Sequence, residues 1–218
     1  MDRADSPQEK RVPLFITIPE RSLVVLCGPA GAGKSTFAHS LIQRYKHRKF
    51  APTMIVSSDY CRALVSDDET NQFVSKDAFD IFHYIIRKRM YQNRFTIADS
   101  TALSTEARYN LLDLAAKYHY HTCLLIFDVP LDVCLEHEEQ RHRRVGSEVI
   151  SYHQEQLRKA IEDSQREPWK QVHVLREEHL TLNNNLIRIR ILPPPPSPAH
   201  PPAEPQQEKS TSGENTRG

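Results

Sequence analysis

The sequence predicts an α/β fold in which one parallel β-sheet is flanked by helices. Short apolar runs alternate with amphipathic stretches, a pattern typical of strands joined by helical crossovers. The first run, residues 22–27, is continuously apolar after its leading serine, as expected for a strand buried on both faces. At 218 residues the chain is long enough for one such core. We therefore expect a single folded domain.

Four more strands are expected along the chain. We place them at residues 54–56, 95–98, 123–127 and 172–175, each a short apolar or β-branched run. Because ligands of open parallel sheets lie beyond the carboxyl ends of the strands, functional residues are expected directly after these runs.

Two of the intervening helices have recognisable start signals. Ser75 is a predicted N-cap, and a set of apolar residues follows it at helical spacing. They are Phe79, Phe82, Ile86 and Met90. Ser104 is the predicted N-cap of a later helix with its own apolar side chains. They are Leu111, Leu112, Leu114, Ala115 and Tyr118.

Composition divides the chain into three zones. Residues 1–13 are charged and expected to be flexible, and residues 14–192 are expected to form the domain. Residues 193–218 hold eight of the fifteen prolines and none of the large apolar residues. Such a segment cannot offset its ordering entropy by burial, so we expect a disordered Pro-rich tail. The tail is a candidate tether for an unknown protein.

Bulk composition excludes several classes of protein. The chain has 29 basic and 28 acidic residues, so any surface for nucleic acid must be local. Its four cysteines form no C-x-x-C pair, which favours free thiols in a reducing compartment. No apolar run is long enough for a membrane span, and the polar N-terminus lacks a signal-peptide core. We expect a cytoplasmic protein with no membrane association.

Residues 28–35 match the phosphate-binding pattern G-x-x-x-x-G-K-[ST] in full. The residues are Gly28, Pro29, Ala30, Gly31, Ala32, Gly33, Lys34 and Ser35. The loop follows a predicted strand and precedes a helical stretch that starts with Thr36, which we count among the ATP-binding residues. Backbone N–H groups and the helix end are expected to hold the phosphates of ATP. Lys34 is expected to reach the β- and γ-phosphates, and the Ser35 hydroxyl to ligate Mg²⁺. A glycine-rich turn that binds nothing is the alternative.

The rest of the sequence narrows the class of P-loop protein. It contains no N-K-x-D motif, which counts against a small GTPase. No long apolar run ends in paired acidic residues, as a motor ATPase would require. A small chain with short β-α units and one loop is typical of a kinase that phosphorylates an acceptor. The prediction is thus a P-loop kinase fold with a parallel β-sheet, flanking helices and a helical lid.

Three polar residues follow the second and third strands. Asp59 is placed to orient an acceptor hydroxyl and receive its proton. If a helical turn starts there, Arg62 falls beside it and can bind a phosphate oxygen. The alternative is a helix-capping Asp59 that pairs with Arg62 on the surface. Asp99 ends the third strand and is expected to hold Mg²⁺ through water, the alternative being a cap of the next helix.

A basic run after the fourth strand is the candidate lid. It ends a helical pattern that begins near Leu131, and it contains Arg141 and Arg144, three residues apart. Arginines on a mobile helical hairpin can neutralise phosphate charge during transfer. The alternative is a solvated basic patch that stabilises only the end of the helix.

From about residue 14 to residue 175 the chain resembles the kinase module of bacterial polynucleotide kinase-phosphatase, an RNA end-healing enzyme. The shared motifs are residues 18–26, the phosphate loop with residues 35–38, and residues 57–69, 78–80 and 83–85. Asp99-Ser100-Thr101 also stands where that family has an aspartate, a small residue and a threonine.

The resemblance implies transfer of the ATP γ-phosphate to the 5′-hydroxyl end of RNA or DNA. Residue by residue, it implies nucleotide and metal contacts for Lys34 and Ser35, and a general base at Asp59 with Arg62 beside the acceptor. It also implies that Arg141 and Arg144 are the lid arginines. The family's phosphatase and ligase-like modules do not occur in this chain, which leaves open whether separate proteins supply them.

Two other functions remain as alternatives. One is a small-molecule kinase that acts on a nucleoside, sugar or antibiotic hydroxyl. The other is a non-catalytic ATP-binding module that tethers partners through the tail. An acceptor profile with no need for a phosphodiester would indicate the first, and ATP binding without transfer would indicate the second.

Overall fold

The computed structural model describes residues 13–140, 145–180 and 186–193. The flexible N-terminus and Pro-rich tail predicted from composition therefore lie almost wholly outside the described residues. Within the described residues, no helix is long and apolar enough to cross a bilayer.

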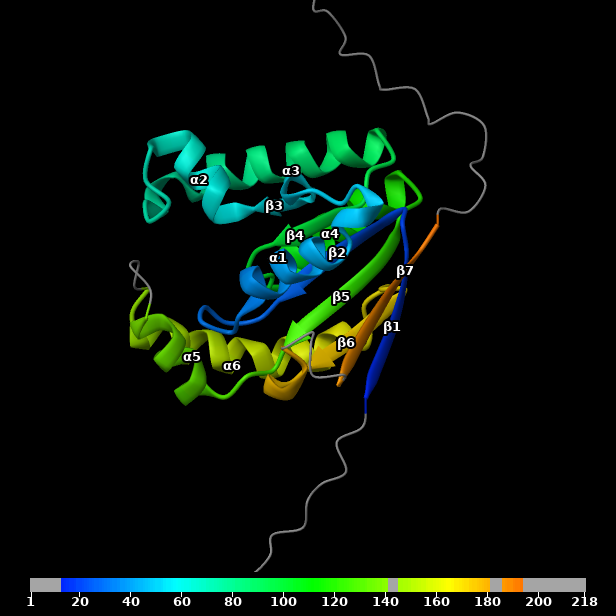
Figure 1. The fold of residues 1–218 in the computed structure, drawn as a ribbon. Helices are drawn as coiled ribbons and strands as arrows, with labels where there is room; N and C mark the ends of the chain where they lie inside the picture. Colours follow the sequence, from blue (N-terminus) through cyan, green and yellow to red (C-terminus); the bar gives the residue numbers. More distant parts are fainter. Residues whose placement is uncertain (1–12, 141–144, 181–185, 194–218) are drawn as a thin grey trace, which may run out of the picture.

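The central sheet has five parallel strands in the order β3-β4-β2-β5-β6 (Figure 1). The strands are β2 (Ser22–Cys27), β3 (Ile55–Ser57), β4 (Thr96–Asp99), β5 (His121–Phe127) and β6 (Gln171–Leu175). All five strands predicted from the sequence are therefore present, each within two residues of its expected bounds. The parallel α/β prediction is confirmed.

Six helices connect these strands in the described residues. They are α1 (Lys34–Arg44), α2 (Ser58–Ser66), α3 (Ser75–Tyr91), α4 (Thr105–Lys117), α5 (Leu131–Glu139) and α6 (Ser147–Ser164). Short 3-10 turns add η1 (Lys46–Arg48), η2 (Pro52–Met54), η3 (Gln72–Val74) and η4 (Glu177–His179).

One of the two predicted helix caps is confirmed and the other is wrong. The Ser104 hydroxyl accepts a hydrogen bond from the Ala107 backbone N–H at 3.2 Å, as an N-cap does. Ser75 is instead the first residue of α3, and Val74 occupies the cap position without a side-chain bond. Because η3 runs directly into α3, the Ser75 hydroxyl donates backward to the Gln72 carbonyl at 2.7 Å.

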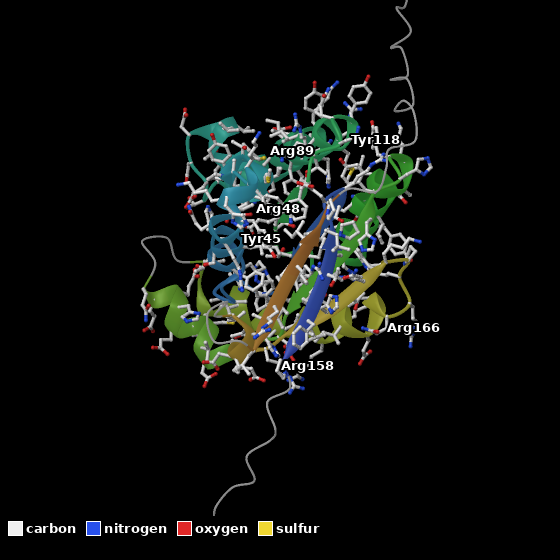
Figure 2. The ribbon with its side chains drawn as sticks, turned by 45° about the vertical axis from the view of Figure 1, so that its right-hand side comes forward. Tyr45, Arg48, Arg89, Tyr118, Arg158 and Arg166 are labelled. Atoms are coloured by element: carbon white, nitrogen blue, oxygen red, sulfur yellow. The ribbon has the colours of Figure 1, made fainter. Side chains whose placement is uncertain are left out.

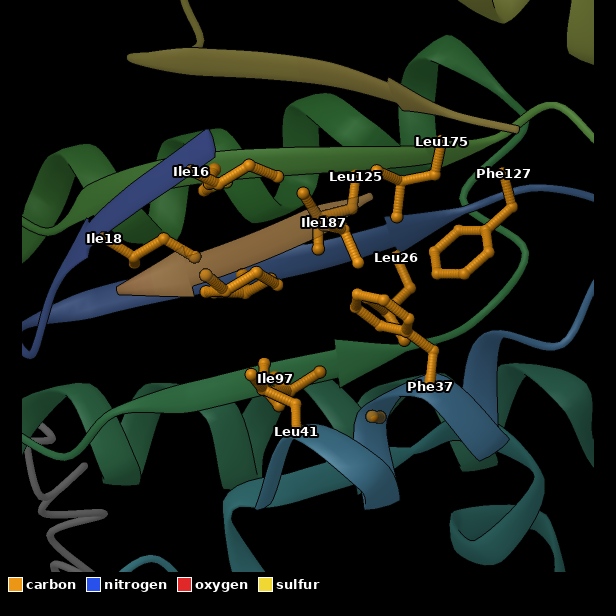
Figure 3. Packing of buried hydrophobic residues seen from close by; sticks show 14 of the residues in the cluster. Ile16, Ile18, Leu26, Phe37, Leu41, Ile97, Leu125, Phe127, Leu175 and Ile187 are labelled. Carbon is orange, nitrogen blue, oxygen red and sulfur yellow. The ribbon is translucent and has the colours of Figure 1, made fainter. Parts of the chain in front are cut away.

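Alternation along the strands separates two apolar cores. Leu23 and Val25 of β2 face the core formed with α3, α4 and α6, whereas Val24 and Leu26 face the opposite side. On that opposite side Phe37 of α1 meets the sheet (Figure 3). Both faces of the three inner strands, β2, β4 and β5, are buried, which explains their largely apolar sequences.

The opposite face also carries a small second sheet that the sequence analysis did not predict. Strands β1 (Leu14–Pro19) and β7 (Ile187–Leu192) pair in parallel as a two-stranded ribbon. Its isoleucines pack over α1 and the central sheet (Figure 3). They are Ile16, Ile18, Ile187, Ile189 and Ile191. One face of the central sheet is thus covered by three helices, and the other by α1 and this ribbon.

Strand register brings the polar residues after the strands to one edge of the sheet. Asp99 is the last residue of β4 and lies opposite Leu26 on one side and Ser57 on the other. The phosphate loop follows β2 directly, and α2 follows β3 without a break. The predicted site residues on these three segments therefore share the carboxyl edge.

Candidate nucleotide and acceptor site

Two glycines of the phosphate loop have conformations that other residues rarely adopt. Gly31 has φ +78°, and a Cβ on it would lie 2.2 Å from the Cys134 carbonyl oxygen of α5. Gly33 has φ +81° and is the N-cap of α1. The backbone can make this tight approach to α5 and enter α1 only because both positions lack a side chain. The pattern G-x-x-x-x-G-K-[ST] thus has a local steric reason here.

Lys34 is buried at the start of α1 and its side chain turns back over the loop. Its ammonium nitrogen Nζ donates to the Gly28 carbonyl at 2.9 Å and to the Pro29 carbonyl at 2.6 Å. The loop therefore holds the ammonium group at the helix N-terminus, where the backbone dipole also favours an anion. This position agrees with the contact to phosphate that the sequence motif predicts.

Asp99 lies beside this lysine and is 6% exposed. Burial raises the pKa of its carboxyl group, while Lys34 and a hydrogen bond with the Ser35 side chain lower the pKa in part. The charge of Asp59 raises the pKa of Asp99 further, so the two carboxylates are close enough to interact. The structure thus brings together the residues predicted to bind ATP, metal and acceptor.

The donor set suits a magnesium ion. The Ser35 hydroxyl and Asp99 carboxylate supply hard oxygen atoms, which Mg²⁺ prefers, and it commonly takes its remaining ligands from water and phosphate. No group of three or more His, Cys, Asp or Glu side chains that could hold a metal occurs in the described residues. A site built from one carboxylate, one hydroxyl and nucleotide phosphates fits these residues.

Asp59 and Arg62 form the predicted pair in the first turns of α2. The Arg62 Nη1 atom lies 2.6 Å from the Asp59 Oδ1 atom, and it also donates to the Glu69 carbonyl at 3.1 Å. The alternative of a capping aspartate is wrong, because Ser57 caps α2 by accepting from the Tyr60 N–H at 3.3 Å. The alternative of an ion pair on the surface is also wrong, because the Arg62 side chain is buried.

The arginine retains binding capacity inside the site. Arg62 is 5% exposed, and its Nε atom has no hydrogen-bond partner among the described residues. The Asp59 side chain beside it is 50% exposed. A buried unpaired donor costs free energy unless a ligand or water satisfies it. The pair therefore combines an accessible proton acceptor with a donor that an anionic group would satisfy.

Two histidines that the sequence analysis gave no role contact the phosphate loop. The Ala30 N–H donates to the Nδ1 atom of His153 on α6 at 3.4 Å. Burial, and then the charge of Lys34, lower the pKa of His153, which keeps its ring neutral and able to accept. His137 of α5 places Nδ1 2.9 Å from the Gly31 carbonyl oxygen. No spacing signal marks these histidines, since only the packing of α5 and α6 brings them to the loop.

A cavity of about 430 Å³ adjoins the phosphate loop. Its walls come from α3, the segment after β4, α4 and α6. They include Phe79, His83, Thr101, Ser104, Tyr152 and His153. Two of these residues contact the loop directly, because the Thr101 carbonyl accepts from the Gly28 N–H at 2.9 Å and His153 accepts from Ala30. The cavity is mostly apolar and opens beside the phosphate-binding backbone.

A buried ion pair fixes the segment that forms one wall of this cavity. Arg108 of α4 is fully buried and donates to the Ala102 carbonyl at 3.2 Å and to the Leu103 carbonyl at 2.7 Å. Its other face binds the Glu167 carboxylate, with Nη2 to Oε1 at 2.7 Å and Nε to Oε2 at 2.9 Å. Asp99 and Thr101 lie just before this anchored segment.

The predicted lid is only partly described. Helices α5 and α6 form the hairpin expected there, and Gly146 precedes α6 with φ +98°. Arg141 and Arg144, the two arginines predicted to contact the nucleotide, lie outside the described residues.

Solved structures with a similar fold include a chain of the Pnkp1/Rnl/Hen1 RNA repair complex. It is 19% identical, with a TM-score of 0.55 over 71% of this chain and 48% of that one. A chain of AvrRxo1-ORF1:-ORF2 with ATP is 15% identical, with a TM-score of 0.51 over 71% of this chain and 54% of that one. The present chain thus spans about half the length of these proteins. At such identities the likeness establishes the fold, and it confirms the resemblance inferred from sequence motifs.

A family model agrees with this result. Residues 23–164 match the model of a family described as an AAA domain. The match starts in β2, covers the phosphate loop and both candidate acidic residues, and ends with α6. It includes 142 of the 218 residues, counted from 23 through 164. The chain therefore belongs to this AAA-domain family and has a P-loop kinase fold.

Proposed function

We propose that the protein is an ATP-dependent kinase that transfers the γ-phosphoryl group to the 5′-hydroxyl end of RNA or DNA. The observation that carries the proposal is the Asp59–Arg62 pair at the carboxyl edge of the sheet. A half-exposed carboxylate suits a hydroxyl, and a buried arginine with an unpaired Nε suits a phosphate next to that hydroxyl. A polynucleotide end presents both groups together.

The donor half of the site would hold the nucleotide. Backbone N–H groups at the end of the phosphate loop and in the first turn of α1, together with the Lys34 ammonium, would bind the phosphates of ATP. Ser35 would ligate Mg²⁺ directly and Asp99 through water. The bound ion would neutralise charge on the β- and γ-phosphates.

The acceptor half of the site would supply orientation and a proton acceptor. The 5′-oxygen forms a bond to the γ-phosphorus as the bond from that phosphorus to the β–γ bridging oxygen breaks, and ADP leaves. Asp59 takes the hydroxyl proton, and Arg62 holds the neighbouring phosphodiester. Arg141 and Arg144 would neutralise developing charge from the lid. Tyr60, which follows the base and is 62% exposed, could stack on the terminal nucleobase.

Two further features support RNA ends as the acceptor. The sequence motifs resemble the kinase module of an RNA end-healing enzyme, and a solved structure of similar fold belongs to an RNA repair complex. We also propose that phosphatase and ligase enzymes act beside this kinase, with the Pro-rich tail as a candidate tether.

The cavity beside the phosphate loop favours a second candidate function. Its volume of about 430 Å³ falls within the usual size of small-molecule sites. Phe79 and Tyr152 provide aromatic walls, and the neutral His153 a polar group. A kinase for a nucleoside or a similar small hydroxyl compound would use the same donor half of the site.

Transfer of label from γ-labelled ATP with Mg²⁺ distinguishes the two candidates. The acceptors would be 5′-hydroxyl RNA and DNA oligonucleotides, a nucleoside 3′-monophosphate, nucleosides and sugars. We expect label on oligonucleotide 5′ ends, with the nucleoside 3′-monophosphate a better acceptor than the nucleoside, because only the former offers a phosphate to Arg62. Equal labelling of a nucleoside would favour the small-molecule kinase.

Variants test the assigned roles in the same assay. Asp59→Asn is expected to lower kcat about 100-fold or more, since general-base catalysis typically contributes that much. Lys34→Ala should abolish transfer by removing a phosphate contact. Asp113→Asn changes an exposed aspartate on α4 and serves as the matched control. ATP binding without transfer to any acceptor would instead support a non-catalytic module.

A further inference from the structure

The outer face of the β1–β7 ribbon carries an exposed aromatic ring and two arginines. Isoleucines alternate with outward residues, so the ribbon buries one face and exposes the other. The outward side chains are Phe15, Thr17, Arg188 and Arg190. Phe15 is 64% exposed, and the Arg188 guanidinium lies 5.9 Å from its ring centroid. An exposed aromatic ring beside two arginines offers a stacking face and positive charge on the same surface.

A basic segment lies against the free edge of β7. The Tyr45 hydroxyl donates to the Ile189 carbonyl, and Arg48 Nη1 donates to the Ile191 carbonyl. Figure 2 shows Tyr45 and Arg48 beside the ribbon. These bonds satisfy the edge carbonyls of β7 and fix the segment 44–49 there. Its exposed basic residues are Arg44, Lys46 and Lys49.

The other edge of the ribbon adjoins β6. The Gln171 side-chain amide donates to the Thr17 carbonyl at 2.8 Å. The exposed Lys170 directly precedes this glutamine and therefore lies near β1. Basic residues thus flank the ribbon on both sides as well as lying on it.

Positive charge is concentrated on these segments, although the chain as a whole is nearly neutral. They hold seven basic residues, which we call the basic band: Arg44, Lys46, Arg48, Lys49, Lys170, Arg188 and Arg190. Within the described residues, Arg48 of this set lies 3.7 Å from Glu20. The chain overall has a net charge of only +1. The band is therefore a local positive field of the kind that attracts a polyanion.

We propose that the basic band and Phe15 bind the backbone and one base of a single-stranded nucleic acid, downstream of the end that is phosphorylated. The inference rests on the proposed function. Arg188 and Arg190 are two residues apart on one strand, about 6.7 Å, so they can contact different phosphates of one extended chain. Phe15 provides a ring for base stacking, which tolerates any sequence, and Arg188 beside it contributes charge.

The position of the band predicts a length requirement for the acceptor. Lys34 begins α1 at the phosphate loop and Arg44 ends it, so the helix places the Arg44 end of the band roughly 16 Å from the loop. At a stacked rise of about 3.4 Å per nucleotide, roughly five nucleotides cover that distance. An acceptor of three nucleotides would fill the site without reaching the band, whereas a 20-mer would reach it.

Variants of the full-length chain test the band through binding and through activity. The charge variant is Arg188→Ala/Arg190→Ala, and its control is Lys76→Ala/Lys117→Ala, two exposed lysines on α3 and α4. For a labelled 20-mer RNA, the charge variant should bind about tenfold more weakly by fluorescence anisotropy. The slope of log K against log salt should fall by about 1.4 for two lost contacts on a single strand. Catalytic preference for a 20-mer over a trimer should fall by a similar factor.

The aromatic contribution has a separate readout. Phe15→Ser should weaken 20-mer binding about tenfold while leaving the salt slope as in wild type, because stacking releases no counterions. Phe15→Tyr should restore binding. Circular dichroism and thermal melts would confirm that both sets of variants are folded.

Binding of a 5′-phosphorylated 20-mer separates this inference from the proposed function. That ligand cannot accept phosphate, so band-dependent binding without any polynucleotide kinase activity would overturn the function and keep the band. Unchanged 20-mer binding in the charge variant would overturn the band. Arginine-dependent binding to phosphatidylserine vesicles but not to RNA would also overturn it, and would identify a membrane surface as the partner.

Discussion

Two buried charged residues, Asp99 and Arg108, lie at the ends of one short segment and have opposite surroundings. Burial lowers the pKa of Arg108, but hydrogen bonds and the charge of Glu167 more than offset it, so the net pKa is raised. Burial raises the pKa of Asp99, and Lys34 and Ser35 offset it only in part. The surroundings of Arg108 therefore favour its charged form, whereas those of Asp99 disfavour it.

We interpret this as the difference between a structural charge, Arg108, and a candidate functional charge, Asp99. All three guanidinium nitrogens of Arg108 have an acceptor, namely Glu167, the carbonyls of residues 102 and 103, and Thr105. A buried carboxylate whose negative charge is only partly stabilised by neighbouring groups is typical of a site that a bound ligand completes. Arg108 thus holds the segment in place, and Asp99 remains available for a bound cation.

The largest expected effect on stability comes from breaking the structural pair. Glu167→Ala would leave Arg108 buried without its carboxylate, which should cost about 3–5 kcal/mol of unfolding free energy. Urea denaturation measures this loss. Glu162→Ala, at an exposed position on α6, should change stability by less than about 0.5 kcal/mol. The double variant Arg108→Met/Glu167→Leu should recover part of the loss, because it removes the unpaired charge but leaves the carbonyls of residues 102 and 103 without their donor. A Glu167→Ala protein as stable as wild type would refute a structural role.

Nucleotide binding should stabilise the protein through the phosphate loop, and this gain should not depend on the Arg108–Glu167 ion pair. ATP with Mg²⁺ at 100 times its Kd should raise the unfolding free energy by about 2.7 kcal/mol. Lys34→Ala should lose this gain, because its ammonium group is predicted to contact the phosphates. Arg108→Met/Glu167→Leu should keep it. Equal thermal shifts for wild type and Lys34→Ala would place the nucleotide elsewhere.

Removing the uncompensated charge should stabilise the protein and inactivate it. Asp99→Asn keeps the shape and can still bond with Ser35, so the free protein should gain roughly 1 kcal/mol, the usual size of such a gain. The rate of phosphoryl transfer should fall sharply, and the reaction should need a higher Mg²⁺ concentration. Asp113→Asn on the surface of α4 is the control and should alter neither quantity. A destabilised Asp99→Asn protein would show that the carboxylate is structural.

The sequence predicted the central sheet well because its three inner strands, β2, β4 and β5, are buried on both faces. A continuous apolar run such as residues 22–27 has few other interpretations once turns and helices flank it. The ribbon was missed although β7 carries a signal, the strict alternation of isoleucine and arginine over residues 187–191. Alternation of that kind indicates a strand with one exposed face. Its parallel pairing with β1, 168 residues or more away, is not encoded locally.

The site was predictable where local chemistry defines it. The phosphate-loop pattern marked Lys34 and Ser35, and the i, i+3 spacing correctly placed Arg62 against Asp59. His153 could not be predicted in the same way, because α6 must pack across the sheet before its ring reaches the loop. Burial of Arg108 likewise depends on Glu167, which lies 59 residues away. Long-range packing, and not composition, decides such contacts.

The smallest expected effect concerns pH and compares a histidine in the site with one outside it. Burial lowers the pKa of His83, His121, His153 and His173, so the unfolded chain binds protons more readily at each position. Their contribution to stability is complete above pH 6.5 and is lost as pH falls from 6.5 through the lowered pKa values. Since all four are partly exposed, we expect each contribution to be small.

His153 and His173 differ in what else this protonation should change. Either His153→Gln or His173→Gln should flatten the pH dependence of unfolding between pH 5 and 7 by a similar amount. His153 accepts from the phosphate loop and lies near Lys34, whereas His173 of β6 contacts Gln171. Only His153→Gln should therefore also alter the pH dependence of the Kd for ATP, measured by calorimetry. If both variants change the pH dependence of the Kd for ATP equally, protonation of His153 does not affect nucleotide binding through the loop. The contact between His153 and Ala30 would then be structural only.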